Sequence, residues 1–159
     1  MKKLKKGERG FTLIEMLVVL ALIGIITGGI TAAIMQVLTI NTRASNHMIA
    51  LRQVQQAGKE VSKDALQAQN VTCGNNSGFP LTLTWQDWNG VLNEVVYTII
   101  DEIDSNALQR SHNVTGVRVI AQYIDTGQTS CSWNNVTLTF KVTATLGNGR
   151  YGAIETRVY

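Results

Sequence analysis

An uncharged and strongly apolar run near the start of the chain limits the folds available to it more than any other feature. No formal charge occurs from Met16 to Thr42 in this chain of 159 residues. As a helix, residues Met16–Met35 would be about 30 Å long, roughly the thickness of the hydrocarbon core of a bilayer. We therefore predict a membrane-spanning helix, followed by enough chain for about one compact domain.

The positive charge of the chain is concentrated before this run. The first ten residues hold five cations and one carboxylate, a net charge of +4, whereas the whole chain has +3. The remaining residues therefore sum to −1, and composition gives no reason to expect nucleic acid as a partner. Basic residues that precede a membrane span stay in the cytoplasm, which places the residues after the span outside it.

Two cysteines, Cys73 and Cys131, lie on the predicted extracytoplasmic side. Thiols in an oxidising compartment are more often paired than free, so we predict a disulfide between them. Closing a loop of this size would stabilise the fold by about 4 kcal/mol in the chain-entropy model. The alternative is a metal site that also uses His47 and His112, but these residues lack the close paired spacing of zinc ligands. We expect no metal and no other cofactor.

A carboxylate, Glu15, stands directly before the uncharged run. An ionisable side chain in a membrane segment is costly unless it finds a partner, so it is by default a functional residue. The alternative is that Glu15 snorkels to the interface, which suits the longer Lys and Arg side chains better. The leader also differs from a secretory signal, because the small residue Gly10 comes before the apolar run and no A-x-A cleavage site follows it.

The basic leader, the Gly10–Phe11 junction, the run Thr12–Met16 and the long apolar segment occur in one register. This arrangement resembles the type III signal of type IV pilins and of the pseudopilins of type II secretion systems. The resemblance implies cleavage after Gly10 by prepilin peptidase and methylation of the new amine of Phe11. It also implies that Glu15 pairs with the terminal amine of a neighbouring subunit, a contact that sets register more than it adds stability.

One position departs from the pattern of the major subunits in this family. They usually have a proline about 22 residues into the mature chain, where this sequence has Ala32. Gly24, Gly28 and Gly29 precede it, and each weakens a helix by about 1 kcal/mol relative to alanine while allowing close helix approach in a bilayer. The resemblance therefore implies a minor subunit, most similar to the J-type minor pseudopilins and related minor pilins.

After the span, apolar residues recur at spacings of three or four, which predicts that the helix continues as an amphipathic stem. The predicted apolar face comprises Ile40, Ala44, Met48, Leu51, Val54, Gly58, Val61, Ala65 and Ala68. We expect one helix from about Thr12 to about Asn70, with its first part in lipid and its second part packed on a folded head. His47 and His112 are expected to be solvated or capping residues.

From Leu81 onward the apolar period changes to two, which predicts β-strands. The expected strands are Leu81–Trp85, Val91–Ile100, Ala107–Ser111, Val117–Ile124, Val136–Thr145 and Tyr151–Val158. Residues 70–80 are expected to form a loop, and Asn89–Gly90 favours a two-residue hairpin.

These strands predict one antiparallel sheet of about four to six strands, covered on one face by the stem. The predicted fold class is therefore α+β, a long N-terminal helix packed on a C-terminal antiparallel β-sheet head. The predicted segments are a leader at 1–10, a transmembrane and assembly helix at 11–36, a stem at 37–70 and the head at 71–159.

Several weaker patterns have an ordinary structural interpretation as well as a functional one. One predicted turn has four side chains with oxygen atoms: Asp101, Glu102, Asp104 and Asn106. This turn could bind Ca²⁺, but a solvated turn is the better interpretation because the spacing and the glycine of an EF-hand are missing. Three tryptophans could form an adhesive patch, although tryptophans in strands usually pack in the core; they are Trp85, Trp88 and Trp133. Four N-x-S/T sequons are formally glycosylation acceptors, at Asn70, Asn75, Asn113 and Asn135.

No catalytic motif is present in the sequence. It has no G-x-S-x-G elbow, no phosphate-binding loop and no H-E-x-x-H pair. Ser130 and Ser132 have no base beside them in sequence, and a disulfide would remove Cys131 as a nucleophile. We therefore expect a protein that is not an enzyme.

The resemblance implies a structural subunit of a type IV pilus-like or type II secretion filament. Its expected partners are the inner membrane, other pilin or pseudopilin subunits, prepilin peptidase and the assembly platform protein. Before assembly it would cross the inner membrane once with its head outside the cytoplasm, and afterwards it would lie in a filament in the periplasm or at the cell surface. The alternative is a binding or adhesion domain that stays anchored by an uncleaved helix.

Overall fold

A computed structural model of the chain describes residues 10–75, 77–103 and 105–159. In this part of the chain, one long helix is followed by eight strands and a short 3-10 helix. The elements are α1 (Leu13–Ala65), β1 (Asn70–Gly74), β2 (Gly78–Gln86), β3 (Leu92–Asp101), β4 (Asn106–His112), β5 (Gly116–Ala121), β6 (Ser130–Trp133), β7 (Leu138–Leu146), η1 (Gly149–Tyr151) and β8 (Ala153–Val158). The chain divides into two compact units between Asn41 and Thr42, so α1 contributes to both.

The first unit consists, where it is described, of residues 10–12 and the apolar part of α1. Its large side chains are exposed, for example Leu13 at 82% and Ile25 at 73%. α1 is long and apolar enough to cross a membrane. The hydroxyl groups of Thr31 and Thr39 donate to backbone carbonyl groups four residues earlier, so neither hydroxyl needs water as a partner. A continuous apolar surface of this kind needs lipid or other apolar helices around it.

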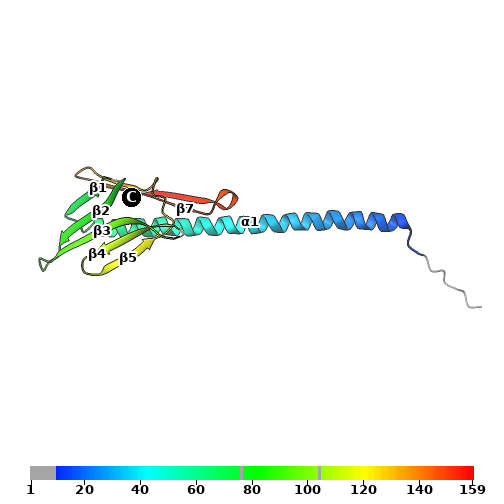
Figure 1. The fold of residues 1–159 in the computed structure, drawn as a ribbon, viewed down its shortest axis with the longest axis horizontal. Coiled ribbons are helices and arrows are strands. Elements are labelled where there is room, and N and C mark those ends of the chain that lie inside the picture. Colours follow the sequence, from blue (N-terminus) through cyan, green and yellow to red (C-terminus); the bar gives the residue numbers. More distant parts are fainter. Residues whose placement is uncertain (1–9, 76, 104) are drawn as a thin grey trace, which may run out of the picture. The chain divides into compact units, whose positions relative to one another are not determined.

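The second unit contains two antiparallel sheets, with strand orders β1-β2-β3-β4-β5 and β6-β7-β8. Figure 1 shows the five strands of the larger sheet side by side along the last turns of α1. Four α1 side chains are fully or almost fully buried in the core: Ala50, Val54, Ala57 and Val61. They pack with side chains from both sheets, among them Leu83, Tyr97, Leu108, Phe140 and Val142. The predicted α+β fold, a long helix packed on an antiparallel β head, is confirmed.

The buried face of α1 differs from the predicted one. Met48 is 51% exposed, whereas Ala50 and Ala57, which the pattern assigned to neither face, are fully buried. Small side chains at the contact let the helix approach the sheets closely. Gly58 shows this most directly, because a Cβ atom there would clash with the ring of Tyr159.

Besides the end of α1, the β head also differs from the prediction. It forms two sheets and not one, because β7 pairs with β6 and β8 and not with the larger sheet. β1 lies in the segment predicted as a loop, and α1 ends at Ala65, before the predicted end near Asn70. The β2–β3 connection is a five-residue loop, Asp87–Val91, and not a two-residue hairpin.

The carboxylate of Asp87 explains the longer loop. Its Oδ1 atom accepts hydrogen bonds from the backbone N–H groups of Asn89 and Val91, both at 2.9 Å. Gly90 adopts a φ of +78°, a conformation that glycine takes without steric cost. The aspartate therefore organises the turn from inside, and the Asn-Gly pair serves as part of a larger loop.

Candidate functional site

The predicted processing junction lies just before α1. Gly10 is exposed, Phe11 is 74% exposed, and residues 10–12 belong to no helix or strand. Thr12 caps the helix, because its Oγ1 atom accepts a hydrogen bond from the N–H of Glu15 at 3.3 Å. The peptide bond between Gly10 and Phe11 is therefore in an accessible, non-helical segment. The rest of the leader, residues 1–9, lies outside the described residues.

Glu15 is exposed in the first turn of α1, where the helix dipole favours a carboxylate. Within the described part of the chain, no hydrogen bond or ion pair engages its carboxylate. The side chain is therefore available for a contact with another molecule.

The structure brings the two cysteines together. Cys73 on β1 and the buried Cys131 on β6 are present as thiols whose sulfur atoms are 3.4 Å apart. The thiol of Cys131 donates a hydrogen bond to the carbonyl group of Gly78, with a sulfur–oxygen distance of 2.7 Å. Burial, followed by the contact with Cys73, raises the pKa of the Cys131 thiol, so this sulfur is not a reactive thiolate at neutral pH.

The histidines lie apart from the cysteines. His47 is exposed, and its Nε2 atom is 3.2 Å from a carboxylate oxygen of Glu155. His112 lies at the end of β4, where its Nδ1 atom accepts hydrogen bonds from the backbone N–H groups of Val114 and Thr115 at 3.2 and 3.0 Å. Among the described residues, no group of three or more His, Cys, Asp or Glu side chains is placed to hold a metal ion.

Burial, and then the positive charge of Arg110, lower the pKa of His112 from its ordinary value. The imidazole ring packs against Trp85, with ring centroids 5.9 Å apart. Its neutral form is the one that accepts the two backbone hydrogen bonds, so a capping role for His112 agrees with the prediction.

A buried polar cluster of three residues connects α1 to the larger sheet. Asp64, 3% exposed, accepts hydrogen bonds from the Nε and NH2 groups of Arg110 at 2.7 and 3.0 Å. The hydroxyl group of the fully buried Tyr97 donates to the same carboxylate at 2.5 Å. The sequence pattern missed this cluster, because Asp64 does not fit an apolar face and its partners lie on β3 and β4.

The protonation states of this cluster indicate a structural role. Burial, and then the hydrogen bond to Asp64, raise the pKa of Tyr97, while the hydrogen bond to Asp64 raises the pKa of Arg110. Tyr97 therefore stays neutral and Arg110 stays charged across the physiological range. Each donor is directed at an oxygen of Asp64, which leaves the group satisfied internally.

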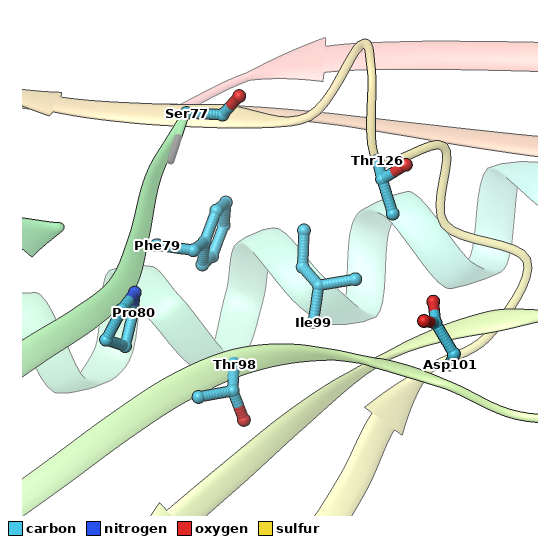
Figure 2. Close-up of a pocket in the computed structure, with 7 residues that line it drawn as sticks. All are labelled: Ser77, Phe79, Pro80, Thr98, Ile99, Asp101 and Thr126. Atoms are coloured by element: carbon cyan, nitrogen blue, oxygen red, sulfur yellow. The ribbon is translucent and has the colours of Figure 1, made fainter. Parts of the chain in front are cut away.

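A cavity of about 290 Å³ opens between β2, β3 and the loop after β5. Figure 2 shows Phe79 and Ile99 facing into it, with Asp101 at one side. Its described lining supplies one carboxylate and the hydroxyl groups of Ser77, Thr98 and Thr126. A nucleophile with an adjacent base, which covalent catalysis requires, is not among these residues.

The weaker candidates are dispersed over the molecule. Trp88 is 93% exposed in the β2–β3 loop, whereas Trp85 packs on the core and Trp133 lies on β6, so these tryptophans do not form one patch. In the predicted calcium turn, the N–H of Glu102 donates to the carbonyl group of Ser105. Asp104 lies outside the described residues.

Comparison with known proteins identifies the N-terminal region. Residues 5–31 match the family model described as the prokaryotic N-terminal methylation motif. No curated protein and no solved structure matches the chain. The chain therefore combines a prepilin-type methylation motif and an apolar helix with an α+β domain.

Proposed function

We propose that this chain is a subunit of a type IV pilus-like or type II secretion filament. The observation that carries the proposal is the match of residues 5–31 to the methylation motif, a segment that includes Gly10, Phe11 and Glu15. The exposed apolar surface of α1 supports it, because such a surface suits first a bilayer and then a bundle of like helices.

In this function, prepilin peptidase cleaves the bond between Gly10 and Phe11 and methylates the amine of Phe11. The chain then crosses the inner membrane once, with the β head outside the cytoplasm, until the assembly platform protein and other subunits take it into the filament. The segments are the leader at 1–10, the assembly helix at 11–36, the stem at 37–70 and the head at 71–159.

The mature N-terminus tests this function. The protein is isolated from cells with active prepilin peptidase, and its N-terminal peptide is identified by mass spectrometry. We expect a chain that begins with N-methylated Phe11. An intact Met1 would refute the proposal and favour a permanently anchored binding or adhesion domain.

Glu15 is proposed to pair with the terminal amine of a neighbouring subunit. Its exposed carboxylate, without a partner among the described residues, supports this role. Glu15→Ala should leave membrane insertion unchanged or improved, because a carboxylate is removed from an apolar segment, and should impair incorporation into filaments. Glu94→Ala, a loss of the same charge at an exposed position on β3, is the control. Normal incorporation of the Glu15 variant would show that the pair is not needed.

Within the filament we propose a minor role, of the kind that J-type minor pseudopilins and related minor pilins have. The support is Ala32, which stands where major subunits usually have a proline. Quantitative immunoblotting of purified filaments tests it, with a low ratio of this chain to the main subunit as the expected result. A ratio near or above one would contradict the minor role.

We also propose that Cys73 and Cys131 form a disulfide outside the cytoplasm. Their sulfur atoms are 3.4 Å apart on strands of different sheets, so oxidation would join the two sheets covalently. Peptide mapping of the protein without reductant should recover the cross-linked pair. In the chain-entropy model the bond adds about 4 kcal/mol to the free energy of unfolding, which Cys73→Ser should remove only under oxidising conditions. An equal loss with and without reductant would contradict the bond.

A further inference from the structure

The exposed side of α1 in the second unit carries a row of cations, Arg52, Lys59 and Lys63, which we call the cationic stripe. These residues are seven and four positions apart, so they lie on one face of the helix over roughly 16 Å. All three side chains are exposed, and none has a hydrogen bond or ion pair among the described residues.

No carboxylate on α1 compensates this stripe. Asp64 is buried against Arg110, and Glu60 pairs with Arg118 at 2.5 Å. Lys59 and Lys63 are four residues apart, a spacing at which like charges destabilise a helix. The stripe is therefore a face that an acidic partner would stabilise.

The same chain exposes carboxylates of the opposite sign where β3 ends. Asp101 and Glu102 are both exposed, and neither carboxylate has a partner among the described residues. Ile103, which follows them, is fully exposed. We call Asp101, Glu102 and Ile103 the acidic turn.

One copy of the chain cannot bring these two surfaces together. The helix face that packs on the larger sheet contains Val54 and Val61, and the cationic stripe lies on the opposite side of the same turns. β3, which carries the acidic turn, belongs to that larger sheet. The cations thus point away from the sheet that holds the carboxylates, and only another molecule can pair them.

We propose that the cationic stripe of one copy binds the acidic turn of a second copy of this chain. The two surfaces are different, so the contact is heterologous, with the stripe of one copy against the turn of the next. Ile103 would pack on the aliphatic stems of the lysines while the carboxylates meet their ammonium groups. The contact extends the proposed filament function. It uses only the second unit and needs no cleavage at Gly10, and two neighbouring copies are enough to form it.

Zero-length cross-linking of the full chain in detergent tests the contact. Isotope-labelled and unlabelled protein are mixed, treated with a carbodiimide that joins lysine amines to carboxylates, and digested for mass spectrometry. We expect linked peptides of mixed isotope composition that join Lys59 or Lys63 to Asp101 or Glu102, with a yield that falls as salt is added. Absence of these mixed peptides at low salt would overturn the proposal, whether or not the N-terminus is processed.

Charge reversal gives the second test. Lys59→Glu/Lys63→Glu and Asp101→Lys/Glu102→Lys each remove one of the two groups that the carbodiimide joins and place like charges opposite each other, so each variant alone should give no linked peptide at these positions. Mixing the two variants should restore linked peptides, since one supplies a reversed stripe and the other a reversed turn. Arg43→Glu/Arg157→Glu, with the same change in net charge, should retain the wild-type yield. No recovery of linked peptides on mixing would refute the contact.

Discussion

The buried carboxylate of Asp64 should be one of the strongest single contributors to the stability of the second unit. Asp64→Ala removes the acceptor of three hydrogen bonds, two from Arg110 and one from Tyr97. It leaves a guanidinium group with 10% of its side chain exposed and no counter-charge. Breaking a buried ion pair in this way costs about 3–5 kcal/mol, so we expect a loss of that size in the free energy of unfolding.

Urea unfolding of the full chain in detergent measures this loss, with tryptophan fluorescence as the signal. Tyr97→Phe should cost less, about 1.5–3 kcal/mol, because the ion pair survives and only one bond to a charged group is lost. Asp64→Ala/Arg110→Ala should cost less than the sum of the single variants, with a coupling of about 0.5–3 kcal/mol, because it leaves no unpaired charge. A loss below about 1 kcal/mol for Asp64→Ala, or strictly additive single variants, would refute this account.

Three further outcomes follow from the second unit. The pKa of His112 is lowered in the folded chain, so the unfolded chain binds a proton more readily. The free energy of unfolding should therefore be highest above the ordinary histidine pKa of 6.5 and should fall as the pH drops through it. Urea unfolding of His112→Asn, which keeps an acceptor, should lack this dependence, and an unchanged pH profile would contradict the assignment. Gly58→Ala should destabilise the unit by about 1–3 kcal/mol, because the new methyl group meets the ring of Tyr159, and a neutral effect in the same assay would show that the ring moves aside. Arg118→Ala breaks an ion pair with Glu60 that is partly exposed, so it should cost only about 0.2–1 kcal/mol and less at high salt; a larger or salt-independent loss would show that this pair does not behave as a surface pair.

The sequence predicted those features of the fold that depend on local periodicity. The uncharged run and the three- and four-residue spacing after it indicate one long helix, and α1 extends from Leu13 to Ala65. Alternation from Leu81 onward indicates strands, and β2, β3 and β7 overlap segments predicted as strands. These predictions are correct because the periodicity of a helix or a strand depends only on residues within that element.

The missed features depend on contacts between distant elements. β1 contains Asn70 and Gly74, which resemble loop residues, and it becomes a strand because β2 offers it a pairing edge. The separate sheet of β6, β7 and β8 likewise depends on which strands pair, and the sequence of a single strand does not show its partner. Ala50 and Ala57 are buried because the sheets come close, and not because alanine is strongly apolar.

The candidate site divides in the same way. Gly10, Phe11 and Glu15 could be proposed from the sequence because they lie within one short contiguous segment. Asp64, Arg110 and Tyr97 are not, because an aspartate on a helix is taken as solvated until its partners from other strands are known. Their separations along the chain, 46 residues for Asp64 to Arg110 and 33 for Asp64 to Tyr97, leave no local signal.

The position of Asp64 also has a mechanical consequence. It lies within the last turn of α1, and its partners belong to two adjacent central strands of the larger sheet, β3 and β4. A force applied along this part of α1 would therefore act on the three hydrogen bonds of Asp64 together with the packing of Val54 and Val61. Asp64 thus fastens the last turn of α1 to the larger sheet, so a pull on this part of the helix is also a pull on β3 and β4.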